Sequence, residues 1–413
     1  MKWSAIIGGA VAMTAVTALA ADAQTSSGPA SPPTFTAGWD EGFVLQSANG
    51  DNRIVLGLTA QADGRFSLDD PLPITNTFTL RKARPGLSGR VGKYFDFKFT
   101  PDFGSGNAVL LDAYFDVRFS PAIRVRSGKD KTPVGYELLQ GDAYLLFPER
   151  SLASSLVPNR DVGFQLLGEI SPRLSYAAGI FNGVPDGTSS TADADSSHAK
   201  DLAGRIVWHP FRSAAAPAGV LNGLGFQIGG SIGGQAGTLP SFRTSAGQSY
   251  FSYAAGSAAA GVRTRITPAA FYYHRSFGGF VEYVRSAQQV SRAGSDEDIS
   301  NQGWGIAGSY VLTGENTSDR GVRPRHPFDP SAGHWGALQV AARYSQLAVD
   351  RLVFSRGFAA PAASRKAGAF TLAANWYPTF FIKYYATFER TTFDGGAVRP
   401  AENIILFRAQ LAF

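Results

Sequence analysis

The chain has 413 residues and a formal net charge of +6, with 44% hydrophobic residues, 47 glycines, 30 phenylalanines and no cysteine. This composition excludes an intrinsically disordered chain and a small fold held by disulfides. So many glycines and phenylalanines, beside only two methionines, favour strands and turns over a helical core.

The first residues have the pattern of a secretory signal peptide. Lys2 precedes the apolar run AIIGGAVAMTAVTALA, and the small residues that follow, up to Ala23, fit an A-x-A cleavage site. A single membrane anchor is the alternative, but it would need about 20 apolar residues without this small-residue exit. We therefore predict a signal peptide over 1–23 and a flexible N-terminal segment over 24–38.

Apolar and polar residues alternate strictly through much of the remaining chain. In RIVLGLTAQADGRF, residues 53–66, Ile54, Leu56 and Leu58 share one parity, whereas Arg53 and Asp63 share the other. A helix cannot sort residues in this way, but a strand does. The same pattern occurs at residues 95–103, 112–119, 338–345, 370–376, 382–389 and 404–413.

Turn-forming and polar clusters separate these runs and are predicted to be loops. They are residues 69–76, 182–201, 291–301, 313–330 and 393–403. Two of them contain the acidic stretches ADAD and SDED, which could bind Ca²⁺ or bridge lipopolysaccharide through cations, although plain solvated loops are the simpler interpretation.

Two architectures use such strands: a water-soluble β-sandwich and a transmembrane β-barrel with a polar lumen. Tryptophan and tyrosine gather near strand ends, in VWHPF, GSYVLTG and NWYP, as expected for girdles at a membrane interface. The polar parity also carries many full charges, which a sandwich core would not tolerate unpaired. At roughly 24 residues per strand, the chain predicts an all-β, antiparallel transmembrane barrel of about 16 strands over 39–413.

The last residue, Phe413, is preceded at alternating positions by Leu411, Ala409 and Phe407. This ending resembles the C-terminal assembly signal of bacterial outer-membrane proteins. We therefore expect the barrel assembly machinery to be a partner of the chain.

Several long segments resemble the phosphate-selective porins O and P. They include EGFVLQSANGDNRIVLGLTAQAD, FTLRKARPGLSGRVGKYFDFKFTPDFG, LLDAYFDVRFSPAIRVRSGKDKTPVGYELLQGD, LFPERSLASSLVPNRDVGFQLLGE and PFDPSAGHWGALQVAARYS. The resemblance covers about nine tenths of the chain in consistent order. It implies a 16-stranded barrel in the outer membrane of a Gram-negative bacterium, commonly a homotrimer, which passes anions by diffusion.

The resemblance also implies a loop around 133–161 that folds into the barrel and narrows it. Known phosphate-binding members carry lysines in this loop, but this chain has none between Val134 and Phe147, where it carries Glu137 and Asp142. It also places Asp130 between Lys129 and Lys131. These departures leave an anion channel as the expectation and put tight phosphate selectivity in question.

A pore selects by the sign and spacing of the charges that line it. The predicted anion-binding and pore-lining residues are Arg81, Lys82, Arg84, Lys98, Arg118, Arg124, Arg126, Lys129 and Lys131, with Arg53 and Arg65 as further inward candidates. The predicted pore-lining acids are Asp96, Asp112, Asp116, Glu137 and Asp142. The basic residues could form a ladder for anions, or they could simply be paired with the acids across the wall.

The cluster of Arg81, Lys82 and Arg84 is the strongest candidate, since three basic residues occur within four positions. The apolar parity also changes there, from even at Phe78 and Leu80 to odd beyond them, and a β-bulge would explain the change.

Other apparent chemical signals are weaker. GGSIG around Ser231 fits a nucleophile motif, but no helix is predicted to follow the strand, as the motif requires. The five histidines have no zinc-binding spacing, so no metal site or cofactor is expected. The basic charge is spread over strands, so no nucleic-acid partner is expected.

The sequence therefore predicts a non-enzymatic porin for small inorganic anions, with phosphate or polyphosphate as the implied cargo, surrounded by outer-membrane lipids and lipopolysaccharide. The alternatives are a general diffusion porin, or one for organic acids or sugars, a barrel enzyme, and a secreted β-sandwich binding protein.

Overall fold

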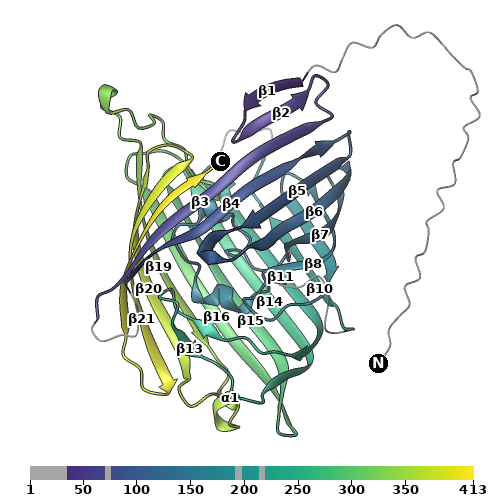
Figure 1. The fold of residues 1–413 in the computed structure, drawn as a ribbon, viewed down its shortest axis with the longest axis vertical. Helices are drawn as coiled ribbons and strands as arrows, with labels where there is room; N and C mark the ends of the chain where they lie inside the picture. The colour runs from purple at the N-terminus through teal and green to yellow at the C-terminus, as the bar shows by residue number, and fades with distance from the viewer. Residues whose placement is uncertain (1–34, 70–75, 191–197, 214–218) are drawn as a thin grey trace, which may run out of the picture. The chain divides into compact units, whose positions relative to one another are not determined.

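The computed structural model describes residues 35–69, 76–190, 198–213 and 219–413, and within them strands of a single sheet close into a 16-stranded antiparallel barrel (Figure 1). The barrel strands are β3 (Arg53–Ser67), β4 (Thr77–Val91), β5 (Phe95–Asp102), β6 (Val109–Ser120), β7 (Ile123–Lys131), β8 (Arg160–Ser171), β9 (Leu174–Phe181), β10 (Asp201–Trp208), β11 (Leu224–Gly237), β14 (Ala258–His274), β15 (Phe277–Arg292), β16 (Ser295–Val311), β19 (Ala337–Ala348), β20 (Ser364–Tyr377), β21 (Ile382–Gly396) and β22 (Glu402–Ala412). The predicted fold class is confirmed.

The barrel closes where the last strand meets the first. β22 pairs with β3 from Ile404↔Ser67 to Ala412↔Thr59. Beyond that point the hairpin of β1 (Phe35–Trp39) and β2 (Phe43–Ser47) pairs with the start of β3. β2 therefore follows β22 end to end along the same edge of β3.

The N-terminal predictions are tested only in part by the described residues. The predicted signal peptide at 1–23 lies outside them and stays a prediction, and so does most of the segment 24–38 that was expected to be flexible. Residues 35–38 belong to β1, and the barrel itself begins at Arg53 rather than at residue 39.

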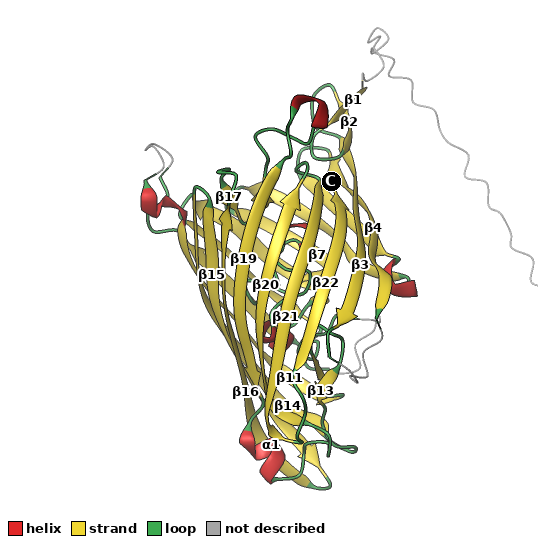
Figure 2. Ribbon diagram, turned by 90° about the vertical axis from the view of Figure 1, so that its left-hand side faces the viewer, coloured by secondary structure: helices red, strands yellow, loops and turns green. Residues whose placement is uncertain are grey.

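The short elements lie between barrel strands (Figure 2). They are η1 (Gly104–Gly106), η2 (Asp142–Tyr144), η3 (Leu152–Leu156), η4 (Val220–Gly223), β12 (Phe242–Arg243), β13 (Ser249–Phe251), β17 (Thr317–Ser318), β18 (Gly321–Val322), η5 (Pro330–Ala332) and α1 (Arg351–Ser355). No helix in the described residues is long and apolar enough to cross a membrane.

One predicted loop is wrong. Residues 291–301 were expected to form a polar loop, but β15 and β16 run through them and pair as far as Arg292↔Ser295. The turn needs only Ala293 and Gly294, whose φ angles of 50° and 81° suit a two-residue hairpin turn. The polar residues around the turn lie on strands, so the loop that their composition predicted is wrong.

The alternation places apolar side chains on the outer face as expected. Phe95 and Phe115 are 51% and 53% exposed, whereas Asp112 and Asp116 on the other parity are buried. In a membrane, the outer face contacts lipid. The girdle expectation also holds, because Trp208, Tyr310 and Trp376 lie at or next to the ends of their strands.

The lumen is not uniformly polar. Inward residues of the long strands, such as Val284 and Leu347, pack with Leu156 of η3, with Phe242 of β12 and with Phe358 of the loop after α1. This apolar cluster occupies part of the lumen beside β15–β20.

Candidate pore constriction

Residues 132–159, between β7 and β8, fold into the barrel and form what we call the constriction loop. Thr132 N–H donates to the carbonyl of Asn159 at 2.9 Å and closes the loop at its base. This segment covers most of the range 133–161 in which an inward loop was expected, and the last two residues of that range belong to β8.

The far wall of the barrel holds the loop through side chains. Lys383 Nζ on β21 donates to the carbonyl of Leu145 at 2.8 Å, and Asn375 Nδ2 on β20 donates to that of Leu146 at 3.0 Å. On β15 the carboxylate of Glu282 accepts from the N–H groups of Tyr136, at 2.6 Å, and Glu137, at 3.1 Å. The loop therefore crosses the lumen and is anchored on the side opposite to its base.

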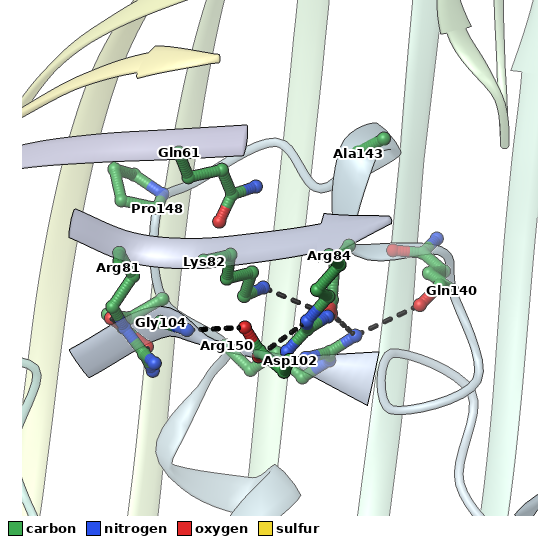
Figure 3. Close-up of polar contacts among 12 residues, drawn as sticks. Gln61, Arg81, Lys82, Arg84, Asp102, Gly104, Gln140, Ala143, Pro148 and Arg150 are labelled. Carbon is green, nitrogen blue, oxygen red and sulfur yellow. Dashed lines mark hydrogen bonds and ion pairs between the residues drawn. The ribbon is translucent and has the colours of Figure 1, made fainter. Parts of the chain in front are cut away.

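A bulge in β4 orients the predicted basic cluster. β3 pairs Gln61 with Lys82 and Ala62 with Leu80, so Arg81 is an extra residue in the ladder. This confirms the predicted bulge, which lets Arg81 and Lys82, although adjacent, both reach the lumen. Figure 3 shows Arg81, Lys82 and Arg84 side by side on this strand.

Asp142 of the loop forms ion pairs with three neighbouring basic residues. Its carboxylate lies 2.9 Å from Lys82 Nζ and 2.6 Å from an amino group of Arg150, and it also pairs with Arg84. The side chains of Lys82 and Asp142 are only 6% and 9% exposed, so each charge depends on the others for compensation. Arg84 is also held by Asp102, with Nε and Oδ2 2.6 Å apart (Figure 3).

Glu149, also in the constriction loop, is the acidic partner of Arg81 and of two further arginines. Its carboxylate lies 3.1 Å from Arg81 Nε, 3.6 Å from Arg65 and 3.8 Å from Arg408. Arg408 in turn donates two hydrogen bonds of 2.7 Å to Asp63. The loop is therefore fixed to β3, β4 and β22 by ion pairs as well as by backbone contacts.

The predicted acids of β5 and β6 are partners of four predicted bases, Lys98, Arg118, Arg124 and Arg126, and of two that were not predicted, Arg90 and Arg160. The pairs are Arg90–Asp96 at 2.8 Å, Arg118–Asp96 at 3.9 Å, Lys98–Asp112 at 3.1 Å, Arg160–Asp112 at 2.7 Å, Arg126–Asp116 at 2.8 Å and Arg124–Asp116 at 3.5 Å. Pairing leaves a positive remainder on this wall because several acids serve two bases.

The two predicted lysines of β7 bind backbone carbonyls. Lys129 Nζ donates to Ser190 at 2.6 Å, while Lys131 Nζ donates to Leu138 at 2.6 Å and Gln140 at 2.9 Å. The predicted pore-lining acid Glu137 is buried instead, 3.1 Å from Arg343. It holds the loop rather than bordering the open space.

A cavity of about 570 Å³ lies between the loop tip, at residues 139–144, and the β3–β10 wall, and we call it the passage. Its basic lining residues are Arg84, Lys98, Arg126, Lys131, Arg160 and Arg205, and its acidic ones are Glu41, Asp112, Asp130 and Asp142. A neighbouring cavity of about 600 Å³ near the 48–52 turn is lined by Arg53, Arg90, Lys98, Arg124 and Arg126, with Asp96 and Asp116.

Sequence reasoning missed Arg90, Arg160, Arg205, Glu282, Arg343 and Arg408. For Arg205, the alternation of DLAGRIVW would have sufficed, since it places Arg205 on the inward parity with Ala203. For Glu282, Arg343 and Arg408, alternation gives the face, but nothing local predicts that their partners are loop residues far away in the chain.

The family model described as phosphate-selective porin O and P matches residues 54–413. The chain belongs to this family. It is therefore a porin of the Gram-negative outer membrane, and its family and fold point to a channel rather than an enzyme. None of the curated protein sequences compared with the porin is similar enough to count as a relative.

Solved structures share the fold of this porin at low sequence identity. The outer membrane channel DcaP of Acinetobacter baumannii is 11% identical with a TM-score of 0.59, covering 89% of this chain and 99% of its own. An anion-selective porin from Comamonas acidovorans is 13% identical with a TM-score of 0.53, covering 88% and 100%. A trimer form of OmpT of Vibrio cholerae is 13% identical with a TM-score of 0.53, covering 88% and 99%.

Proposed function

We propose that this porin lets small anions, including phosphate and polyphosphate, diffuse across the outer membrane. The observation that carries the proposal is the lining of the passage, where six basic residues face four acidic ones. The neighbouring cavity continues the excess, with five basic residues and two acidic ones. Low-dielectric walls make such an excess act more strongly on a passing ion than it would in bulk water.

The acids of the constriction loop do not argue against anions. Asp142 is compensated by three bases, and Glu137 is compensated by Arg343, away from the passage. The absence of loop lysines therefore removes one possible binding site for phosphate without making the passage negative. We accordingly propose anion preference with weak phosphate binding.

The same contacts support one alternative, a general diffusion porin with little selectivity. Most cations of the predicted ladder are within 4.0 Å of a carboxylate, which reduces the field they offer to a solute. An enzymatic function has less support, because Ser231 is buried on β11 and its hydroxyl accepts a hydrogen bond from Arg265 at 3.0 Å.

We further propose that the porin is a homotrimer, as the solved trimer form of OmpT suggests.

The test is the reversal potential of the purified porin in a planar bilayer under a KCl gradient, followed by a phosphate titration of the chloride current. A potential of the sign for chloride permeation supports an anion channel. Zero potential supports general diffusion, and the opposite sign overturns the proposal. Block by phosphate only at high concentration is the result expected from a loop without lysines.

A further inference from the structure

Arg205 differs from the other basic residues of the passage. It lies on the inner face of β10, half-buried, and lines the passage. Among the described residues it has neither a carboxylate within 4.0 Å nor a hydrogen-bond partner, whereas Arg84, Arg126 and Arg160 each have at least one. Its guanidinium therefore has no hydrogen-bond or ion-pair partner among the protein groups that the structure describes.

The strand register explains the missing partner. Arg205 pairs with Ala177 on β9, and Ala177 pairs with Leu167 on β8, so its inward neighbours on that side carry no polar side chain. On the other side it pairs with Gly229. The charged groups that act on it most are Asp130 and Arg126, and these two already form an ion pair with each other.

The surroundings of Arg205 are therefore apolar on one side, and the nearby charges of Arg126 and Asp130 compensate each other. Leu167 and Ala177 line the passage beside it, and Leu139 of the loop tip lines the same cavity. Tyr114 also contributes its ring, over which the guanidinium of Arg126 lies at 3.7 Å from the ring centre. A guanidinium binds a carboxylate through two parallel hydrogen bonds, and apolar side chains favour removal of a hydrocarbon body from water.

We propose that Arg205, Leu167 and Ala177 form a binding site for amphipathic carboxylates, meaning a carboxylate attached to an aromatic or short aliphatic body. This inference rests on the proposed anion pathway and names a class of solute for it. Inorganic phosphate fits the site less well, because the apolar side offers nothing to its remaining oxygens. Weak binding at one point of the route speeds entry without preventing release.

The experiment compares benzoate with acetate as blockers of the chloride current in planar bilayers. For the unaltered porin, benzoate block is expected to saturate, with a half-blocking concentration about tenfold below that of acetate, a ratio within the range for an added apolar contact. Arg205→Gln is expected to raise the half-blocking concentration of both acids. Leu167→Asn is expected to raise that of benzoate alone, which a purely electrostatic role of Arg205 would not produce.

Arg285→Gln is the matched control. Arg285 lies exposed on the outer face of β15, so this substitution removes the same charge at a position away from the passage. Folding of every variant is checked by its heat-dependent migration on SDS gels, and Arg205→Lys, which keeps the charge, serves if Arg205→Gln does not assemble. Equal benzoate block in the unaltered porin and in the Arg205 and Leu167 variants would overturn the site while leaving anion selectivity intact. A reversal potential of the cationic sign would overturn the proposed function itself.

Discussion

At the scale of single residues, Asp142 is the acid of the passage with the most basic partners. It compensates Lys82, Arg84 and Arg150 at once. Replacing it by asparagine removes one negative charge and leaves these cations partly uncompensated beside the solute. We expect Asp142→Asn to raise the anion-to-cation permeability ratio a few-fold, measured by reversal potentials in a KCl gradient.

The matched control is Asp394→Asn, which removes the same charge from an exposed side chain on the outer parity of β21. It is expected to leave the ratio nearly unchanged, because charges exposed to bulk solvent are screened. An unchanged ratio in Asp142→Asn would mean that ions do not pass close to this carboxylate.

Arg408 provides a stability test at the same scale. Its side chain is 0% exposed and its two hydrogen bonds to Asp63 join neighbouring strands. Arg408→Gln leaves a buried carboxylate without its partner, so we expect a loss of about 3–5 kcal/mol in the free energy of unfolding. Urea titration in micelles, followed by tryptophan fluorescence, measures it.

Arg390→Gln is the control for that experiment, since Arg390 lies exposed on the outer parity of β21. Its unfolding free energy should change by less than about 0.5 kcal/mol. Similar losses in both variants would show that the Arg408–Asp63 pair contributes no more to the free energy of unfolding than an exposed arginine does.

Sequence alone predicted which face these residues occupy but not which partners they choose. The period of two places Asp63 inside, and the parity change at the bulge places Lys82 there. The partner of Lys82 is set by how the constriction loop folds back, and no local pattern encodes that path. Pairing between distant segments had to come from the structure.

At the scale of elements, the barrel does not need the constriction loop for closure. β7 and β8 pair directly from Arg124↔Leu167 to Lys131↔Arg160. Replacing residues 136–150 by a short Gly-Ser linker should therefore leave the barrel folded and increase the single-channel conductance several-fold. Bilayer recordings measure the conductance, and heat-dependent migration on SDS gels checks the fold.

The control for this replacement exchanges residues 105–108, the loop between β5 and β6, for glycine and serine, and its conductance should remain near that of the unaltered porin. A porin without the 136–150 segment that kept its original conductance would show that the narrowest point lies elsewhere.

Strands were predicted most accurately where one face is apolar. Loops were predicted least accurately where a strand continues into a run of polar residues. The 293–294 turn is the example: its strands continue into polar residues, so composition indicated a loop while the φ angles make a tight hairpin. The apolar cluster inside the lumen was also not foreseen, since inward valines such as Val284 interrupt the polar parity.

At the scale of the whole molecule, Phe413 extends the pairing of β22 with β3 that closes the barrel, which we call the seam. Phe413 exchanges two backbone hydrogen bonds with Leu58, of 2.8 and 3.0 Å. Its ring lies 5.2 Å from that of Trp39 and 5.9 Å from that of Phe43, on the N-terminal hairpin. We expect Phe413→Ala to lower the yield of assembled barrel and to destabilise it by about 2 kcal/mol.

The measurement is the fraction of heat-modifiable protein in the outer membrane, with Phe103→Ala as the control. Phe103 is an exposed ring next to the end of β5, outside the seam, so its loss should change little. Equal yields for both variants would show that the terminal ring is not needed to close the barrel.

The apolar packing behind the constriction loop has a further consequence for how the channel sorts solutes. A loop held only by water-exposed polar contacts could yield to a large molecule, but this one is backed by a close-packed interior that resists compression. A solute that is slightly too wide therefore meets a rigid surface on one side and a hydrogen-bonded wall on the other. We expect permeation to fall sharply, rather than gradually, as the cross-section of the solute increases.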